Sequence, residues 1–94
     1  MNREPTIINL AMAIKDTEYS QVIPNGTTKL LIRSRNSNDI KLSYTDGESG
    51  TKFITIPAGS TGKWIEALEL NGKTLYMQYA DGESADVAEI EIWK

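Results

Sequence analysis

The sequence predicts an all-β protein, a single small β-sandwich or jelly-roll-like domain of seven or eight short antiparallel strands with an N-terminal arm. Three observations lead to this prediction. Apolar and polar residues alternate through many short segments, turn-forming dipeptides separate these segments, and two motifs occur twice in the same order. Alternation with a period of two places successive side chains on opposite faces of a strand, so it indicates strands with one face buried.

The repeated motifs divide most of the chain into two related units. IPNGTT returns as IPAGST, and YTDGES returns as YADGES, with two alternating segments between the motifs each time. Asn-Gly and Asp-Gly turns between alternating segments are the strongest short-range hairpin signals. We therefore expect two related hairpin units, at residues 23–49 and 56–84, inside one β-sandwich domain at residues 19–94.

The expected strands follow one another closely along the chain. They lie at residues 19–23, 29–35, 40–44, 52–56, 63–70, 74–80 and 87–93. Proline and glycine end the first and fourth strands, a cluster of asparagine, serine and aspartate separates the second from the third, and Asp-Gly or Asn-Gly turns close the third, fifth and sixth. The expected inward-facing side chains are Ile40, Leu42 and Tyr44, then Leu75, Met77 and Tyr79, and finally Ala88, Ile90 and Ile92.

Residues 1–18 precede the repeats and form the predicted N-terminal arm. Ile8, Leu10, Met12 and Ile14 alternate as they would in a strand, while Ile7 belongs to a set with helical spacing. An extended arm or strand is the favoured interpretation, and a short helix is the alternative. This arm is expected to pack either on its own domain or on a neighbouring subunit. We take the neighbour as the partner, bound by the apolar side chains of the arm: Ile7, Ile8, Leu10, Met12 and Ile14.

The composition lacks the side chains on which much enzyme chemistry depends. The 94 residues include no cysteine and no histidine, so disulfides, thiolate chemistry and the commonest general acid–base group are absent. The net charge of −3 argues against a nucleic-acid partner, and no stretch approaches the roughly 20 apolar residues of a membrane span. We expect a protein that is not an enzyme and has no cofactor, no metal site, no nucleic-acid partner and no membrane partner.

Acidic residues on the repeated turns could be read as calcium ligands, since calcium prefers oxygen donors. These residues are Asp46, Glu48, Asp81 and Glu83. Neither turn has the acidic density of a calcium loop, and Asp-Gly suits any tight turn, so a structural turn is the favoured interpretation. If the repeat brings both turns to one end of the fold, they form an acidic rim. A glycosidase pair is disfavoured, because nothing in the pattern indicates the burial that raises the pKa of a catalytic carboxyl.

Two kinds of side chain are candidates for surface contacts. Several aromatic residues, among them Trp64 and Trp93, fall on the polar faces of their segments, which indicates sugar stacking or a protein interface; rings that cover the core edge are the alternative. Arg33 and Arg35 are two residues apart in a strand, so both side chains point the same way. With Lys41 on the next strand they would form a small basic patch, either solvated or paired with an acidic partner surface.

The order of the segments resembles that of small virion proteins of tailed bacteriophages. The similarity lies in a strand ending in VIPNGT, followed by KLLIRSR, DIKLSY, ITIPAGS and TLYMQY, with EIEIW at the close, and it covers about residues 19–93. These relatives are β-sandwich accessory proteins. The resemblance implies a structural role in the virion, after synthesis in the bacterial cytoplasm, as a capsid decoration protein or, less often, a tail protein.

The resemblance also implies the partners. They are the major capsid protein or other virion subunits, together with further copies of the same chain in a homo-oligomer, and the family offers no catalytic residues. The alternative function is a carbohydrate- or receptor-binding module of a virion tip or cell surface, in which Trp64 or Trp93 would stack on a glycan.

Overall fold

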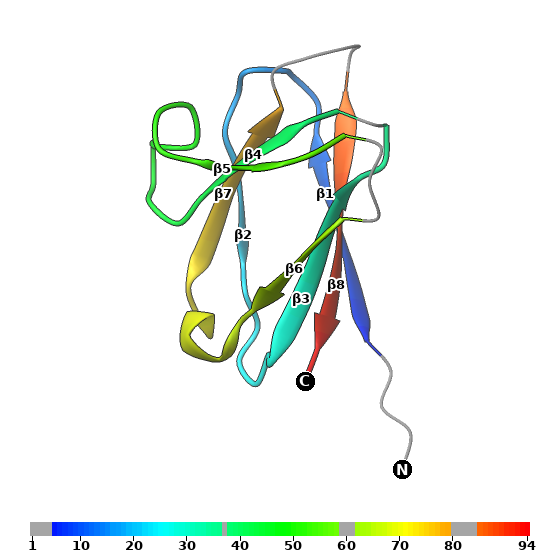
Figure 1. The fold of residues 1–94 in the computed structure, drawn as a ribbon, viewed down its shortest axis with the longest axis vertical. Helices are drawn as coiled ribbons and strands as arrows, with labels where there is room; N and C mark the ends of the chain where they lie inside the picture. Colours follow the sequence, from blue (N-terminus) through cyan, green and yellow to red (C-terminus); the bar gives the residue numbers. More distant parts are fainter. Residues whose placement is uncertain (1–4, 37, 59–61, 80–84) are drawn as a thin grey trace.

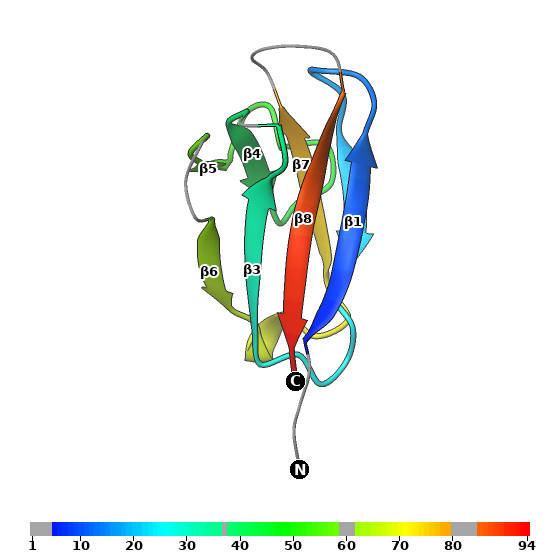
Figure 2. The same cartoon turned by 90° about the vertical axis from the view of Figure 1, so that its right-hand side faces the viewer.

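In the described part of the chain, eight strands form two four-stranded antiparallel sheets that pack face to face (Figures 1 and 2). The computed structural model describes residues 5–36, 38–58, 62–79 and 85–94. The strands are β1 (Thr6–Met12), β2 (Tyr19–Val22), β3 (Lys29–Ser34), β4 (Ile40–Ser43), β5 (Ile54–Ile56), β6 (Lys63–Glu66), β7 (Thr74–Tyr79) and β8 (Asp86–Trp93), and a 3₁₀ helix, η1 (Leu68–Leu70), joins β6 to β7. The predicted all-β sandwich is confirmed.

The strand order is that of a jelly roll. Sheet A has the order β1-β8-β3-β6, and sheet B has the order β2-β7-β4-β5. Apart from β4 and β5, consecutive strands lie in opposite sheets, so the chain crosses from one sheet to the other at nearly every connection. An eight-stranded sandwich wound in this way consists of two Greek keys folded over one core.

The two repeated units pair with each other and do not form two separate hairpins. The first unit contains β3 and β4, and the second contains β6 and β7; β3 pairs with β6 in sheet A, and β4 pairs with β7 in sheet B. The prediction of two hairpin units is therefore wrong. Both strands of a unit carry an apolar row, and these rows bury Leu30 of β3 and Leu42 of β4 from opposite sides of the core. Residues 59–61 and 80–84 of the second motif copies lie outside the described residues.

The core between the sheets contains most of the inward-facing rows that alternation predicts. The confirmed side chains, each at most 2% exposed, are Ile40, Leu42, Leu75, Met77, Tyr79, Ala88, Ile90 and Ile92. Tyr44 is the exception, because it is 43% exposed. β4 ends at Ser43, whose hydroxyl oxygen accepts a hydrogen bond from the Thr45 amide at 3.1 Å, so the chain turns before Tyr44 can continue the row. The predicted burial of Tyr44 is wrong.

The predicted N-terminal arm contributes a strand to the sandwich itself. β1 pairs with β8 along its whole length, from Thr6 opposite Ile92 to Met12 opposite Asp86, and forms one edge of sheet A (Figure 2). A strand satisfies the backbone groups of β8, which a helix packed there would not. The sandwich therefore begins at Thr6, and the predicted boundary at residue 19 is corrected. Of the two conformations considered for the arm, the structure has the strand.

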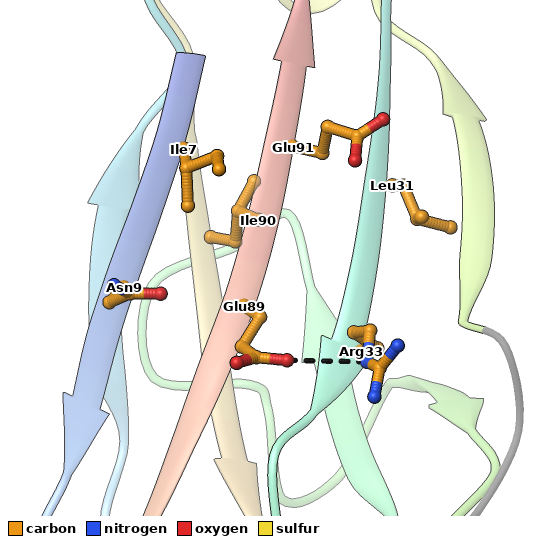
Figure 3. Close-up of a pocket in the computed structure, with 7 residues that line it drawn as sticks. All are labelled: Ile7, Asn9, Leu31, Arg33, Glu89, Ile90 and Glu91. Carbon is orange, nitrogen blue, oxygen red and sulfur yellow. Dashed lines mark ion pairs between the residues drawn. The ribbon is translucent and has the colours of Figure 1, made fainter. Parts of the chain in front are cut away.

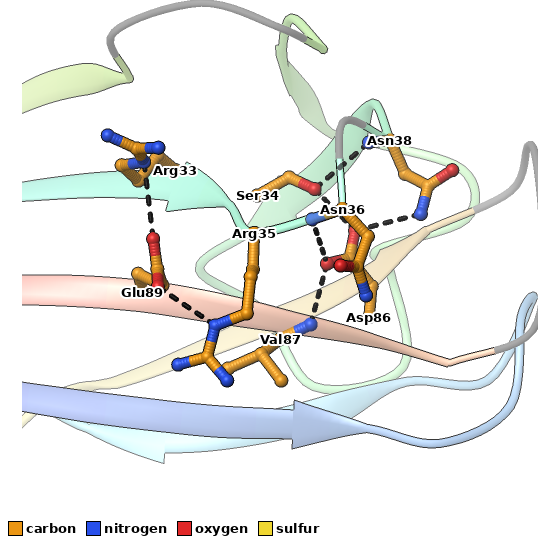
Figure 4. A network of polar contacts seen from close by, with 8 residues as sticks. All are labelled: Arg33, Ser34, Arg35, Asn36, Asn38, Asp86, Val87 and Glu89. Atoms are coloured by element: carbon orange, nitrogen blue, oxygen red, sulfur yellow. Dashed lines mark hydrogen bonds and ion pairs between the residues drawn. The ribbon is translucent and has the colours of Figure 1, made fainter.

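A buried carboxylate joins the ends of β3 and β8 (Figure 4). Asp86 is 1% exposed. Its oxygens accept hydrogen bonds from the Ser34 hydroxyl, the Asn38 side-chain amide at 2.9 Å, and the backbone amides of Asn36 at 3.0 Å and Val87 at 2.6 Å. Burial by itself would raise the pKa of this carboxyl, but the hydrogen bonds outweigh burial and hold its pKa below the usual value. The polar cluster after β3 thus turns the chain around a carboxylate that is distant in sequence.

The Asn71 side chain fastens two turns together at the other end of the sandwich. Its Oδ1 accepts hydrogen bonds from the amides of Gly26 and Thr27, the latter at 3.0 Å. Its Nδ2 donates to the carbonyl oxygens of Thr27 and Ala67 at 2.9 Å and of Leu68 at 3.0 Å. The second Asn-Gly turn therefore clamps the first one to η1, which makes both turns structural.

Candidate interaction surface

The outward face of sheet A carries a cross-strand row of three apolar side chains and one glutamate, which we call the sheet A row. It consists of Ile7 on β1, Glu91 on β8, Leu31 on β3 and Trp64 on β6, which occupy opposed positions in the register. Opposed side chains on one face of antiparallel strands lie about 4.5–5.5 Å apart at Cβ, so the row is continuous across all four strands. Ile7 is 68% exposed and Trp64 is 53% exposed. Figure 3 shows Ile7, Glu91 and Leu31 around a hollow on this face.

The charged groups beside the sheet A row pair with one another. The Nε of Arg33 lies 3.2 Å from one oxygen of Glu89, and the Nε of Arg35 lies 2.9 Å from the other (Figures 3 and 4). The prediction that both arginines point the same way is confirmed. The predicted patch with Lys41 is wrong, because Lys41 lies in sheet B with its ammonium 4.9 Å from the Phe53 ring centroid. Half-exposed ion pairs contribute only about 0–1 kcal/mol each. Because both arginines share the one carboxylate of Glu89, the pairs offset part of the positive charge on this face.

Two tryptophans flank a lysine at one end of the same face. Lys29 is opposed by Trp93 on one side and Glu66 on the other. Its ammonium lies 5.0 Å from the ring centroid of Trp64 and 5.7 Å from that of Trp93, within the range of a cation–π contact. The Trp93 indole N–H donates a hydrogen bond to Glu91 at 2.6 Å, which occupies that carboxylate. Both rings therefore lie on the outer surface, as the alternation predicts.

The five residues of the predicted arm divide between the two faces of β1 and the turn after it. Met12 is fully buried, and Ile8 and Leu10 pack against the core. The domain's own core takes up these three side chains, so they do not form the outward-facing set that the arm prediction requires. Ile7 belongs to the sheet A row, and Ile14, which is 62% exposed, follows β1. Of the five, Ile7 and Ile14 present large exposed surfaces.

A carboxylate from another segment holds the first acidic turn. Glu18 accepts hydrogen bonds from the backbone amides of Gly47 at 2.8 Å and Ser49 at 3.1 Å, and from the Ser49 hydroxyl. Burial would raise the pKa of Glu18, but these hydrogen bonds outweigh it and lower the pKa. Gly47 has a φ of 81°, where glycine is favoured, so this segment has the geometry of a structural turn. Of the acidic residues considered as calcium ligands, Asp46 and Glu48 lie on this turn, and Asp81 and Glu83 lie outside the described residues.

Sequence reasoning found part of the surface and missed the rest. It singled out Arg33, Trp64 and Trp93 but omitted Leu31 and Lys29. A signal for Leu31 was present, because it shares a strand face with Arg33 two residues away. Their cross-strand neighbours come from β6 and β8, which are distant in sequence, so no local pattern could have assembled the row.

The fold and this surface together define a jelly-roll β-sandwich with a charge-paired, partly apolar outer face on sheet A. Within the described ranges, no three acidic side chains come together in a way that could hold a metal ion. No helix in those ranges has both the length and the apolar character needed to cross a bilayer. No protein-family model matches the chain, and no curated protein matches it significantly.

Proposed function

We propose that this protein is a non-enzymatic structural protein of a phage virion, a capsid decoration protein that binds the assembled shell through the outer face of sheet A. The observation that carries the proposal is the sheet A row, in which Ile7 and Trp64 are 68% and 53% exposed on a face whose arginines are paired internally. Exposed apolar patches with a polar rim are typical of protein contact surfaces, and tryptophan and arginine are enriched in them.

The setting in a virion is supported by analogy. Residues 19–93 resemble small virion accessory proteins of tailed phages, and jelly rolls are common among viral capsid proteins. Fold alone does not determine function, so the analogy suggests the kind of partner while the surface suggests where it binds.

The mechanism is burial of the sheet A row against a shell subunit. Complete burial of a large apolar side chain contributes about 1.5–3 kcal/mol. Two such side chains only partly offset the cost of association, so one copy binds weakly. A homo-oligomer that engages several subunits at once gains from the high effective concentration of its remaining sites. The protein therefore stabilises an assembled lattice while binding isolated subunits poorly.

Shells that lack the protein provide the test. Co-sedimentation is expected to show saturable binding, with a copy number that matches symmetry-related positions on the shell. Ile7→Ser and Trp64→Ala are each expected to weaken binding about tenfold, the equivalent of roughly 1.4 kcal/mol. Leu68→Ser is the matched control, because Leu68 is 67% exposed but lies on η1, outside sheet A. Unchanged binding by the first two variants, or an equal loss with the control, would contradict the proposal.

The second candidate function is a carbohydrate- or receptor-binding module. The specific observation in its favour is the exposed Trp64 ring, which borders a hollow together with the polar groups of Lys29 and Glu66. Aromatic rings stack on sugars, and neighbouring charged groups can bind their hydroxyls. The Lys29 ammonium already lies over this ring, in the position that a stacked sugar would need. This contact favours the capsid decoration function over sugar binding. Titration with a glycan panel, monitored by tryptophan fluorescence, is expected to show a response that Trp64→Ala removes; no response across the panel counts against this function.

A further inference from the structure

The edges of the two sheets differ in their protection against pairing with another chain. In the part of the chain that the structure describes, the edge strands are β1 and β6 of sheet A and β2 and β5 of sheet B. β2 and β6 have four residues each and β5 has three. β6 also carries Lys63 and Glu66, and Pro57 directly follows β5. Short strands, charges and proline are the means by which proteins prevent edge-to-edge pairing.

β1 has fewer of these protections, although Pro5 directly precedes it. It is seven residues long, TIINLAM, and contains no charged residue and no proline. Among the described residues β1 pairs with β8 alone (Figure 2). Backbone N–H and C=O groups of alternate residues in such an edge strand point away from the sheet. Ile8 and Leu10 face the core yet remain partly exposed. An additional strand beside β1 would cover both side chains.

We propose that a second copy of this chain covers this edge, with the two β1 strands antiparallel across a twofold axis perpendicular to sheet A. Such an axis keeps the core-facing sides of both copies on the same side of the joined sheet. Two residues that lie opposite each other must then face the same side, so their numbers are both odd or both even. The register that pairs all of β1 then places Asn9 opposite Asn9 of the second copy. Sheet A of one copy and sheet A of the other then form one continuous sheet across the dimer.

The side chains of this register complement one another. On the core side, Ile8 lies opposite Leu10 of the second copy, and the reciprocal pair extends both apolar cores. On the outer side, Ile7 lies opposite Ala11, and the two Asn9 amides meet at the axis. An amide both donates and accepts, so two identical amides can hydrogen-bond to each other. A twofold contact requires such self-complementarity, and β1 carries no charge that would select a charged strand from another protein.

The dimer contact and the shell-binding face are different surfaces, although the proposed shell binding would gain avidity from an oligomer such as this dimer. Dimerisation would nevertheless place two sheet A rows side by side, since Ile7 lies on the strand at the junction. Failure of the dimer would leave the sheet A face available as a binding surface, and failure of shell binding would leave the edge contact untouched.

Sedimentation equilibrium of the full chain tests the dimer directly. From micromolar to millimolar concentration, the apparent mass is expected to rise from 10.4 kDa towards twice that value. Asn9→Lys and Asn9→Asp place like charges opposite each other at the axis, so each is expected to weaken the dimer roughly fivefold. An equimolar mixture of the two variants is expected to recover it as a heterodimer. Ser20→Lys, at an exposed position of edge strand β2, is the control and is expected to leave the dimer unchanged.

Hydrogen–deuterium exchange provides a second measurement on the wild-type protein. Amides of β1 are expected to exchange more slowly as concentration rises, while those of edge strand β5 do not change. Wild-type protein that stays monomeric throughout the concentration range overturns the proposal. This holds even if the β1 edge then proves to bind a strand from another protein. A dimer that is insensitive to both Asn9 substitutions, or one without added protection in β1, also overturns it, because another surface must then be used.

Discussion

Replacement of Asp86 by alanine is expected to destabilise the fold by about 3–5 kcal/mol, the usual cost of leaving buried polar groups without their charged partner. Four donors lose their acceptor: the Ser34 hydroxyl, the Asn38 side-chain amide and the backbone amides of Asn36 and Val87. Asn38 is only 5% exposed, so water cannot readily replace the carboxylate there. Ser34 and Asn36 are more accessible, which keeps the total below the sum of four separate losses.

Asp86→Asn removes the negative charge of the side chain but keeps its size and shape, so it tests the contribution of the charge. One amide oxygen can still accept the two backbone hydrogen bonds, while the NH₂ group can meet the Ser34 oxygen and a reoriented Asn38 amide. The expected loss is therefore smaller, about 1–2 kcal/mol at pH 7. Urea denaturation followed by tryptophan fluorescence measures both variants. Because Asp86→Asn preserves the shape, it keeps the test informative even if the alanine variant fails to fold.

The stability that Asp86 contributes is expected to depend on pH. Its folded pKa lies below its usual value of about 3.9, so the carboxylate form is stabilised by folding. This stability is present above the unfolded pKa and is lost as the pH falls through the lower folded pKa. The asparagine variant should lose less stability than the wild type between pH 7 and about pH 3, with the remaining loss shared by Glu18, whose pKa is also lowered. Equal pH slopes in both proteins, or an alanine variant as stable as the wild type, would refute this account.

Three further substitutions test two glycine turns and one buried hydroxyl. Gly62→Ala should lower the free energy of unfolding by more than about 2 kcal/mol, because φ is 103° there and an added Cβ would lie 2.7 Å from the Ile32 carbonyl oxygen. Gly47→Ala should lower it by only about 1 kcal/mol, because φ is 81° there but nothing lies within 4 Å of the added Cβ. Similar urea midpoints for the two variants would contradict the steric reasoning. Tyr79→Phe should leave stability within about 0.5 kcal/mol of the wild type or raise it, because the buried hydroxyl has no hydrogen-bond partner among the described residues; a loss above about 1 kcal/mol in thermal denaturation would reveal a partner.

Alternation along the sequence predicted many of the side chains that enter the core. Leu75, Met77 and Tyr79 occupy one face of β7 because a strand has a period of two whatever its neighbours are. The same reasoning placed Arg33 and Arg35 together on the outer face. It failed for Tyr44, where a side-chain hydrogen bond ends the strand before the pattern ends.

Assignment of strands to sheets was beyond local reasoning. The repeated motifs indicated that two units are related, but the Asn71-Gly72 turn suggested a hairpin where the chain in fact crosses from β6 in sheet A to β7 in sheet B. The Asp46-Gly47 turn does lie between two paired strands, β4 and β5. β1 could not be distinguished from a helix until β8 was available to pair with Ile8 and Leu10. The sheet A row depends on the same long-range register, since Leu31 meets Glu91 and Trp64 from distant segments.

The position of β8 between β1 and β3 has a consequence for how the chain acquires its structure. β1 is synthesised before β8 and must wait for this partner, encoded near residue 90, with its uncharged and largely apolar segment exposed to solvent in the interval. Closing so long a loop before any contact compensates for it makes the nucleation step slow. A nascent chain that stops before β8 would expose β1 without its partner strand, so the dependence on chaperones during synthesis should be greatest at that point.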